Sequence, residues 1–449
     1  MTPNPMRKVL SFIQEADVEK CDPQTRERLT EAVADVFACT IAGTQAPVAS
    51  IVEKFAAREF REGPCTVFLS PRKTTPTGST LINATMANAL DMDDGHRLTK
   101  GHPGAVVFPA VLAAAESEGA SGKEFMDAML AGYEVAIRAG ILAHRLRPEY
   151  HCTGSWGAIG AAAGAGKLLK LSDDKMEHAL GIAEYHSTYS PMMRCIEVPA
   201  MLKDGISWGS MVGISSAYLA AEGFTGIPSL FAFQEAEELT ADLGQRYRVN
   251  ELYYKPYACC RWAQPAIEAM KEIERSRRVK PEEIESITIY TFEESSQLMK
   301  RYPENTEEAQ YNLFFPLACH LTFGEVGPKE VLFELNHPTV RSLMDRMDVR
   351  VDPEIDAQFP EKALSRLEVR LVGGEVLRSG THQARGDFDY PLSPEEKKTK
   401  FFRLTEPVIG EGRSRQLYDL LQHITEVKAI RDVTALLQTQ SQGSEQSIQ

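Results

Sequence analysis

Residues 88–114 read NALDMDDGHRLTKGHPGAVVFPAVLAA, and this stretch places a dense group of charges between two apolar segments. The ionisable side chains are Asp91, Asp93, Asp94, His96, Arg97, Lys100 and His102. The flanking patterns predict two buried helices, at 78–90 and 104–117. A surface turn is the ordinary alternative, but neither flank is amphipathic. We therefore expect the turn to enter the interior, where rigid neighbours often hold catalytic groups.

Helical patterns dominate outward from this turn, from about residue 7 to residue 264. Asp22 and Pro23 predict the N-cap and first turn of a helix that Gly43 ends. Further helices are expected at 122–144, 156–171, 172–185 and 207–222. Many of their residues are Ala or Gly, which let helix axes approach closely. The pattern therefore predicts a compact helical bundle.

The pattern changes near Pro265, where strand-like alternation begins. Strands are expected at 286–292, 348–351, 367–372 and 376–378, the last two joined at Gly373 and Gly374. Helical segments are expected between them, at 307–321, 329–335 and 338–347. The predicted fold class is mainly α, with an all-helical pattern over 1–265 that returns over 394–440, and a smaller α+β domain over 266–393 of a size typical of a lid. The polar tail, 441–449, is expected to be frayed.

The composition is that of an ordinary globular protein of 449 residues, with 43% hydrophobic and 25% charged residues. Its 63 acidic and 49 basic residues give a net charge of -14, which disfavours nucleic acid and anionic membranes as partners. The first residues predict neither a secretory signal nor a membrane span, so we expect a cytoplasmic protein. The eight cysteines lack zinc-site or cluster spacing, which predicts reduced thiols and no metal.

A second candidate site begins at His151, in EYHCTGSWGAIGAAAGAGKLLKL. Ser155 lies at the start of the helix predicted there, where free backbone N–H groups can receive a carboxylate. A nucleotide-binding loop is excluded because Ala161 and Leu168 stand where that motif needs a glycine and a hydroxyl. Close helix packing explains the glycines better.

Two further clusters carry cations. Lys203, in VPAMLKDGISWGSMVG, precedes another small-residue helix and can bind an anion or act as a base. The alternative is a surface ion pair with Asp204. Lys255, Arg261 and Gln264 lie in YYKPYACCRWAQPAIEA, at the expected domain boundary, where ligand clefts are common. A plain interdomain hinge is the competing interpretation.

Taken in order, these segments resemble the MmgE/PrpD family, whose members include 2-methylcitrate dehydratases, cis-aconitate decarboxylases and iminodisuccinate epimerases. The markers are ALDMDDGH with GHPGA, YHCTGSWGAIGAAAGAGKLLKL, LKDGISW with LAAEGFTG, KPYACCRWAQPAIEA and GDFDYPLSPEEKKTKF. The resemblance covers most of the chain. It implies a helical domain from both chain ends, an α+β lid and a homodimer.

The resemblance also implies site residues. The implied catalytic positions are Asp91, His102, His151, Lys203 and Lys255. Substrate binding is expected from Asp94, Ser155, Arg261 and Gln264. His102 and His151 are the candidates for base and acid, without an assignment of which is which, and Asp91 would orient a histidine or bind a substrate hydroxyl.

Four departures from the family pattern stand out. Gly95 replaces a threonine of many relatives, so a contact to a substrate hydroxyl is expected to be absent. Gln264 replaces a histidine of the dehydratase-like members. Cys260 and Phe315 stand where decarboxylase-like members have histidine and tyrosine, which counts against decarboxylation.

The expected activity is that of a cofactor-independent hydro-lyase acting on a small hydroxy di- or tricarboxylate of the 2-methylcitrate or citrate type. Proton removal next to a carboxylate leaves charge on its oxygens, and preorganised cations can stabilise that charge. An epimerase or isomerase, a decarboxylase, and a non-catalytic binder of an anionic metabolite remain the alternatives.

Overall fold

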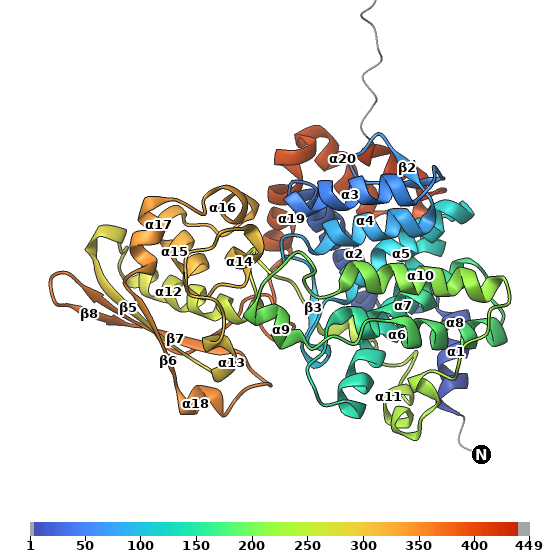
Figure 1. The fold of residues 1–449 in the computed structure, drawn as a ribbon, viewed down its shortest axis with the longest axis horizontal. Coiled ribbons are helices and arrows are strands. Elements are labelled where there is room, and N and C mark those ends of the chain that lie inside the picture. The colour runs from blue at the N-terminus through green and yellow to red at the C-terminus, as the bar shows by residue number, and fades with distance from the viewer. Residues whose placement is uncertain (1–3, 439–449) are drawn as a thin grey trace, which may run out of the picture.

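A computed structural model describes residues 4–438, and the tail expected at 441–449 lies outside them. The fold is mainly α-helical, as the sequence predicts (Figure 1). The helices before residue 264 are α1 (Pro5–Glu15), α2 (Pro23–Gly43), α3 (Pro47–Glu59), α4 (Pro76–Asn88), α5 (Pro103–Glu118), α6 (Gly122–Leu146), α7 (Thr153–Leu168), α8 (Asp173–His186), α9 (Met192–Glu197), α10 (Ile206–Ala221) and α11 (Glu237–Thr240). Two short antiparallel pairs accompany them, β1 (Cys65–Thr66) with β2 (Lys73–Thr74), and β3 (Gly95–His96) with β4 (Leu252–Tyr253).

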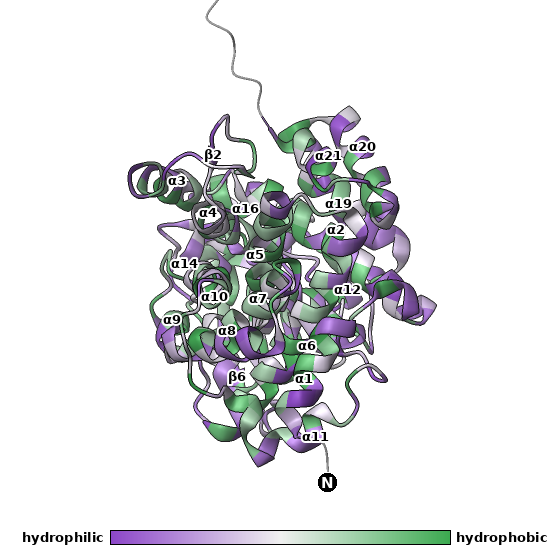
Figure 2. Ribbon diagram, turned by 90° about the vertical axis from the view of Figure 1, so that its right-hand side faces the viewer, coloured by the Kyte–Doolittle hydropathy of each residue, from purple (hydrophilic) through white to green (hydrophobic). Residues whose placement is uncertain are grey.

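Glycines allow the central helices to pack closely. A Cβ added at Gly160 of α7 would lie 2.3 Å from the Cβ of Ala136 and 2.6 Å from the carbonyl oxygen of Gly132, both in α6. Atoms do not approach that closely, so a side chain at this position would push the helices apart. Figure 2 shows α6 and α7 largely in the hydrophobic colours. Close packing therefore explains this glycine, as predicted.

A mixed sheet with helices forms the second part of the chain, seen at the opposite side of the molecule from α7 and α8 in Figure 1. The strand order is β6-β5-β7-β8, with β5 and β6 parallel, the other pairs antiparallel and β9 paired to β7. The strands are β5 (Ile284–Thr291), β6 (Met347–Val351), β7 (Leu364–Leu371), β8 (Val376–Arg378) and β9 (His382–Gln383). The helices are α12 (Gln264–Ser276), α13 (Glu293–Ser296), α14 (Thr306–Gln310), α15 (Phe314–Phe323), α16 (Pro328–Phe333), α17 (Pro338–Met344) and α18 (Pro353–Asp356).

The single helix expected at 307–321 is wrong, because two helices, α14 and α15, occupy that range. Asn312 lies between them, and its side-chain oxygen accepts hydrogen bonds from the backbone N–H groups of Phe314 and Phe315, each at 2.9 Å. A side chain that satisfies those donors starts a new helix at this point. Tyr311 lies in this break, directly after α14.

The last helices return to the first ones. They are α19 (Pro394–Ile409), α20 (Glu411–Gln422) and α21 (Arg431–Thr434). Lys400 of α19 is buried and its ammonium lies 2.6 Å from a carboxylate oxygen of Asp35 in α2. Lys397 pairs with Glu31 at the same distance, 2.6 Å. These contacts join the C-terminal helices to α2. Figure 1 shows α19 beside α2.

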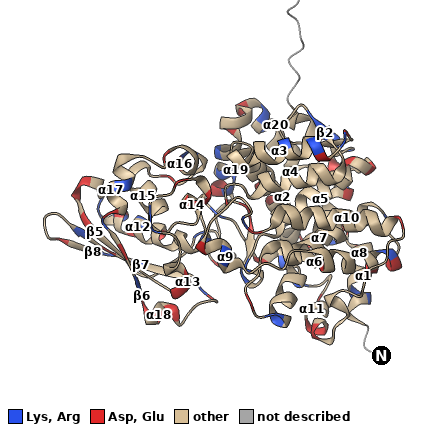
Figure 3. Cartoon of the chain, viewed as in Figure 1, with Lys and Arg blue, Asp and Glu red and all other residues tan. Residues whose placement is uncertain are grey.

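Charged residues are sparse on the central helices. In Figure 3, α5, α7 and α10 are mostly tan, while Lys, Arg, Asp and Glu colour many peripheral segments. Among residues 4–438 no single helix has the length and apolarity to cross a bilayer, whereas the bent pair α2 and α3, at 86°, meets that criterion jointly. The eight cysteines are free thiols and seven of them are buried, in agreement with the prediction of reduced thiols.

Candidate active site

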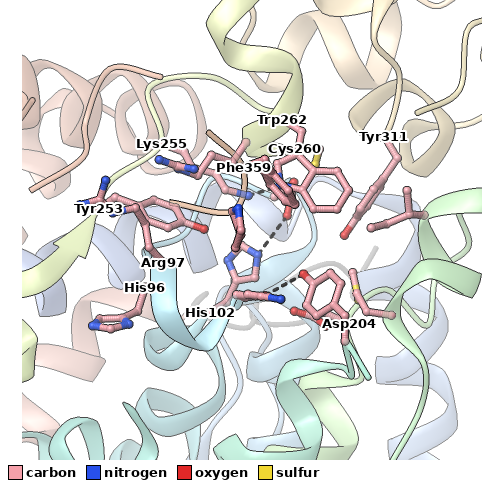
Figure 4. Close-up of a pocket in the computed structure, with 17 residues that line it drawn as sticks. His96, Arg97, His102, Asp204, Tyr253, Lys255, Cys260, Trp262, Tyr311 and Phe359 are labelled. Atoms are coloured by element: carbon pink, nitrogen blue, oxygen red, sulfur yellow. Dashed lines mark hydrogen bonds and ion pairs between the residues drawn. The ribbon is translucent and has the colours of Figure 1, made fainter. Parts of the chain in front are cut away.

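A cavity of about 70 Å³ is lined by residues from both the helical and the α+β part of the chain (Figure 4). Four of the nine predicted site residues line it: Asp91, His102, Lys255 and Arg261. The turn between α4 and α5 supplies the first two, and the segment between β4 and α12 supplies the others. The two sequence segments that hold the predicted site residues on the wall thus meet at one cavity.

His102 is held by a carboxylate behind it. Its Nδ1 lies 3.0 Å from Oδ2 of Asp93 and 3.1 Å from the backbone oxygen of Asp94. The amide of Asn88 donates to the other oxygen of Asp93, at 2.9 Å. Burial opposes the charged form of His102, but Asp93 outweighs it and raises the pKa of the imidazole. Burial would raise the pKa of Asp93, yet His102 and Lys255 lower it to about 2.

Asp91 connects His102 to Lys255 on the cavity side. Nε2 of His102 lies 3.6 Å from Oδ1 of Asp91, and the Lys255 ammonium lies 3.0 Å from Oδ2 of the same carboxylate (Figure 4). Burial disfavours the charged form of Lys255, but Asp91 outweighs it, so the pKa of Lys255 is raised. The backbone of Asp91 adopts a left-handed φ of 54°, a conformation that costs free energy and is common at functional sites.

His102 and the two aspartates that face it also have the composition of a metal site. Asp91, Asp93 and His102 each offer a ligand atom within 4.8 Å of the others, and within residues 4–438 no second such group occurs. Two carboxylates and an imidazole suit a divalent ion. Both carboxylates already face positive groups, and a metal would have to displace the Lys255 ammonium from Asp91. We therefore interpret the group as a proton-transfer centre.

Lys203 lies beside the cavity but does not line it. Its ammonium donates to the backbone oxygen of Asn88 and to the side-chain oxygen of Gln310, each at 2.6 Å. The side chain is buried, and burial lowers its pKa. The alternative of a surface pair with Asp204 is therefore wrong. In this structure Lys203 joins the last residue of α4 to α14.

His151 and Ser155 also lie away from the cavity wall. His151 is buried, hydrogen-bonds through Nδ1 to the Ser155 hydroxyl, and stacks on His144 with ring centroids 4.1 Å apart. Burial, together with His144 and Arg147, lowers the pKa of His151 to about 3. A neutral imidazole at this position is a poor general acid at pH 7 but can still accept a proton, so an acid/base role of His151 stays a prediction.

Asp94 and Gln264, both expected to bind substrate, have contacts within the protein. Burial and the carboxylate of Asp35 raise the pKa of Asp94 to about 8, and its Oδ1 accepts from the Gly104 N–H at 3.0 Å, in the first turn of α5. The amide of Gln264 is buried and donates to the backbone oxygen of Cys259 at 3.0 Å. Neither side chain lines the cavity.

Several wall residues were missed by the sequence reasoning: Lys100, Asp204, Tyr253 and Tyr311. Asp204 is buried, both its oxygens accept from Thr153, and burial raises its pKa to about 6. Asp204 directly follows Lys203 in the sequence. The segment was therefore recognised as a candidate, but its functional role was assigned to the lysine and not to the aspartate. Tyr311 supplies a phenol to the wall, which weakens the inference drawn from Phe315, a buried residue that does not line the cavity. Cys260 does line it, but burial raises its pKa to about 12.

Lys100 is the wall lysine best suited to receive a substrate carboxylate. Its ammonium lies 5.4 Å from the ring centroid of Tyr150, and no ion pair engages it within residues 4–438. By contrast, Lys255 and Arg261 are paired with Asp91 and Asp387. Burial lowers the pKa of Lys100, and a bound anion would oppose that shift.

We expect Lys100→Met to raise KM on the order of tenfold with a smaller change in kcat, because one charge-assisted hydrogen bond to substrate is lost. Initial-rate kinetics measure both constants. Lys100→Arg serves as the matched control and should retain most of the affinity, since it keeps the charge. An unchanged KM in Lys100→Met contradicts the assignment.

A buried imidazole between two carboxylates, in a cavity whose wall carries more cations than anions, defines a candidate acid–base enzyme for organic anions. The chain belongs to the MmgE/PrpD family. Residues 7–237 match the MmgE/PrpD N-terminal domain, and residues 257–424 match the MmgE/PrpD C-terminal domain.

Curated relatives cover nearly the whole chain at low identity. The cis-aconitate decarboxylase-like protein oryM of Aspergillus oryzae is 25% identical, covering 97% of this chain and 97% of that protein. A cis-aconitate decarboxylase of Aspergillus terreus is 24% identical over 92% of this chain and 91% of its own length. The human cis-aconitate decarboxylase is 22% identical, with coverage of 92% and 90%. These relatives support lyase chemistry at the level of the family.

Proposed function

We propose that this protein is a cofactor-independent lyase for a small di- or tricarboxylate, and that its reaction is the dehydration of a hydroxy acid of the 2-methylcitrate or citrate type. The observation that carries the proposal is the position of His102, whose Nε2 faces Asp91 beside Lys255 while Asp93 holds Nδ1. Such an imidazole has a fixed orientation and a raised pKa, so it can transfer a proton at neutral pH.

A dehydration needs two proton-transfer groups, and the wall offers two. Asp204, with a pKa of about 6, is mostly ionised at pH 7 and takes the proton from the carbon next to a carboxylate. The electron pair of that C–H bond forms the double bond as the C–O bond breaks. Protonated His102 gives its proton to the departing hydroxyl, which leaves as water. The cations of the wall stabilise the charge that develops on the substrate carboxylate.

Decarboxylation is the second candidate, and the names of the relatives and the phenol of Tyr311 favour it. In that reaction the C–C bond to a carboxylate breaks and carbon dioxide leaves. The electron pair remains on carbon and takes the proton of His102. This route needs an acid but no base, so Asp204→Asn should spare a decarboxylase and strongly slow a dehydratase.

The deciding experiment supplies purified protein with 2-methylcitrate, citrate and cis-aconitate, in parallel with and without a metal chelator. Absorbance of a new double bond identifies dehydration, released carbon dioxide identifies decarboxylation, and deuterium incorporation with inversion identifies an epimerase. Binding of an acid without turnover or exchange identifies a non-catalytic binder and removes the proposed function. Activity abolished by the chelator removes its cofactor independence.

We also propose that residues 266–393 act as a lid domain over a helical domain formed by 1–265 and 394–440. Tyr311, Phe359 and Pro360 belong to the first range and line the cavity together with the catalytic turn of the second. A movement of the lid domain would open the cavity to substrate, and closure would exclude water from the reaction.

A homodimer is proposed as well, with α9, α10 and the segment between them as the contact surface. Exposed apolar side chains gather there: Val198 at 72%, Leu202 at 66% and Trp208 at 50% relative exposure. Contiguous apolar surface of this kind commonly marks an interface.

We expect the double variant Leu202→Glu, Trp208→Glu to be monomeric in light scattering at concentrations where the unaltered protein is dimeric, because two buried charges oppose association. Phe333→Glu, in α16, is the matched control: Phe333 is 71% exposed but lies outside the proposed surface. A dimer that survives the double variant places the interface elsewhere.

A further inference from the structure

Tyr253 occupies the space that a side chain at residue 95 would need. Gly95 and Tyr253 are directly opposite in the β3–β4 pair. A Cβ added at Gly95 would lie 2.2 Å from Cζ and 2.3 Å from the hydroxyl oxygen of Tyr253. No side chain fits there unless the ring moves. The ring of Tyr253 can therefore occupy this position only because residue 95 is a glycine.

The ring of Tyr253 is held from a second side by Arg261. The guanidinium carbon of Arg261 lies 4.9 Å from the ring centroid, and Asp387 fixes that guanidinium through an ion pair. Tyr253 is buried at 7% relative exposure and lines the cavity. In Figure 4 its ring extends from one side of the site toward His102. The position of the phenol is thus fixed before substrate arrives.

The hydroxyl of Tyr253 is available for a ligand. It makes no hydrogen bond in the part of the chain that the structure describes. The neighbouring cations Lys255 and Arg261 are each already paired with a carboxylate. Burial raises the pKa of Tyr253, so the phenol stays protonated and can only donate toward an anion. Because Tyr253 lines the cavity, an anionic oxygen bound there could accept this hydrogen bond.

We propose that Tyr253 is a substrate-binding residue whose hydroxyl donates a hydrogen bond to a carboxylate oxygen of the substrate. This proposal rests on the proposed function, because it assigns one contact of the same site. The phenol of the facing strand thereby supplies a protein hydroxyl opposite Gly95, where many relatives have a threonine. The phenol would favour substrates with a carboxylate at this end of the cavity.

The test uses the full-length protein and propane-1,2,3-tricarboxylate, an unreactive tricarboxylate without a hydroxyl, as the probe. Tyr253→Phe should weaken its binding about 10- to 100-fold in calorimetry, the range for one hydrogen bond to a charged group. On whichever polycarboxylate the protein converts, kcat/KM should fall by a similar factor. Tyr290→Phe is the matched control, because Tyr290 also lies under an arginine, Arg366 at 3.9 Å, but outside the cavity.

A second variant tests the link to Gly95. Gly95→Ala forces the ring of Tyr253 to move and should weaken binding as much as Tyr253→Phe. When Tyr253→Phe is already present, the same change at Gly95 should cost much less, because no hydroxyl remains to be displaced. Circular dichroism checks that each variant is folded.

The outcomes separate the two proposals. Unaltered protein that neither binds nor converts any tricarboxylate removes the proposed function. Unaltered protein that binds the probe while Tyr253→Phe binds equally well removes only the role of Tyr253. Equal losses from Gly95→Ala with and without Tyr253→Phe likewise overturn the role of the phenol.

Discussion

Replacing His102 by glutamine should lower kcat by about two to four orders of magnitude on whichever polycarboxylate the protein converts, the usual contribution of a general acid or base. His102 lines the cavity, and its two ring nitrogens face Asp93 at 3.0 Å and Asp91 at 3.6 Å. Glutamine keeps a polar side chain of similar length but cannot carry the proton. The loss should appear in kcat more than in KM.

The matched control is His320→Gln. His320 is also buried and its Nε2 also lies near a carboxylate, that of Glu274 at 2.8 Å, but it belongs to α15 and does not line the cavity. Its substitution should leave kcat nearly unchanged. If His102→Gln keeps the full rate on an active substrate, proton transfer must be assigned to another group.

The pH dependence distinguishes the two possible directions of proton transfer. With Asp204 as base, the rate rises as pH increases through about 6, where Asp204 becomes ionised. With His102 as acid, the rate falls as pH increases through the pKa of His102, which Asp93 raises above its usual value against the effect of burial. A bell-shaped profile is therefore expected. If His102 were the base, the rate would rise, not fall, through its pKa.

Part of this site could be predicted because its residues are close in sequence. Asp91 and His102 lie in one turn between two apolar helices, and the charge density of that turn was enough to find them. The roles of the three aspartates could not be assigned. Asp93 holds His102, Asp94 caps α5 and Asp91, with a left-handed backbone, faces the cavity, and only the folded turn separates these three positions.

The remaining wall residues depend on contacts between distant segments. The two-residue strands β3 and β4 bring Gly95 opposite Tyr253, although the two lie far apart in the sequence. Strands that short leave no alternating pattern in the sequence. Tyr311 reaches the wall because Asn312 interrupts the expected helix. His151 fits its motif, yet tertiary packing places its ring against His144 and away from the wall.

Lys255→Met should lower kcat/KM by about two to three orders of magnitude, comparable to the removal of one preorganised charge from an active site. The ammonium is buried and lies 3.0 Å from Asp91, the carboxylate that also faces Nε2 of His102. Without this ammonium, Asp91 loses its closest positive partner. The negative charges of Asp91 and Asp93 beside His102 are then less well balanced. The methionine keeps the length and apolar packing of the lysine stem, so the change is mainly one of charge.

The same variant should move the alkaline limb of the pH profile to higher pH. The charge of Lys255 opposes protonation of His102 and so lowers the pKa of the imidazole, whereas Asp93 raises that pKa more strongly. Removal of that charge raises the pKa of His102, and the acid form persists to higher pH.

Lys255→Arg should retain the original limb because it keeps the charge. Lys123→Met, which removes a lysine paired with Asp17 and Asp127 away from the cavity, should change neither the limb nor kcat/KM. An alkaline limb in Lys255→Met that stays in place or moves to lower pH would contradict the assignment of His102 as the proton donor.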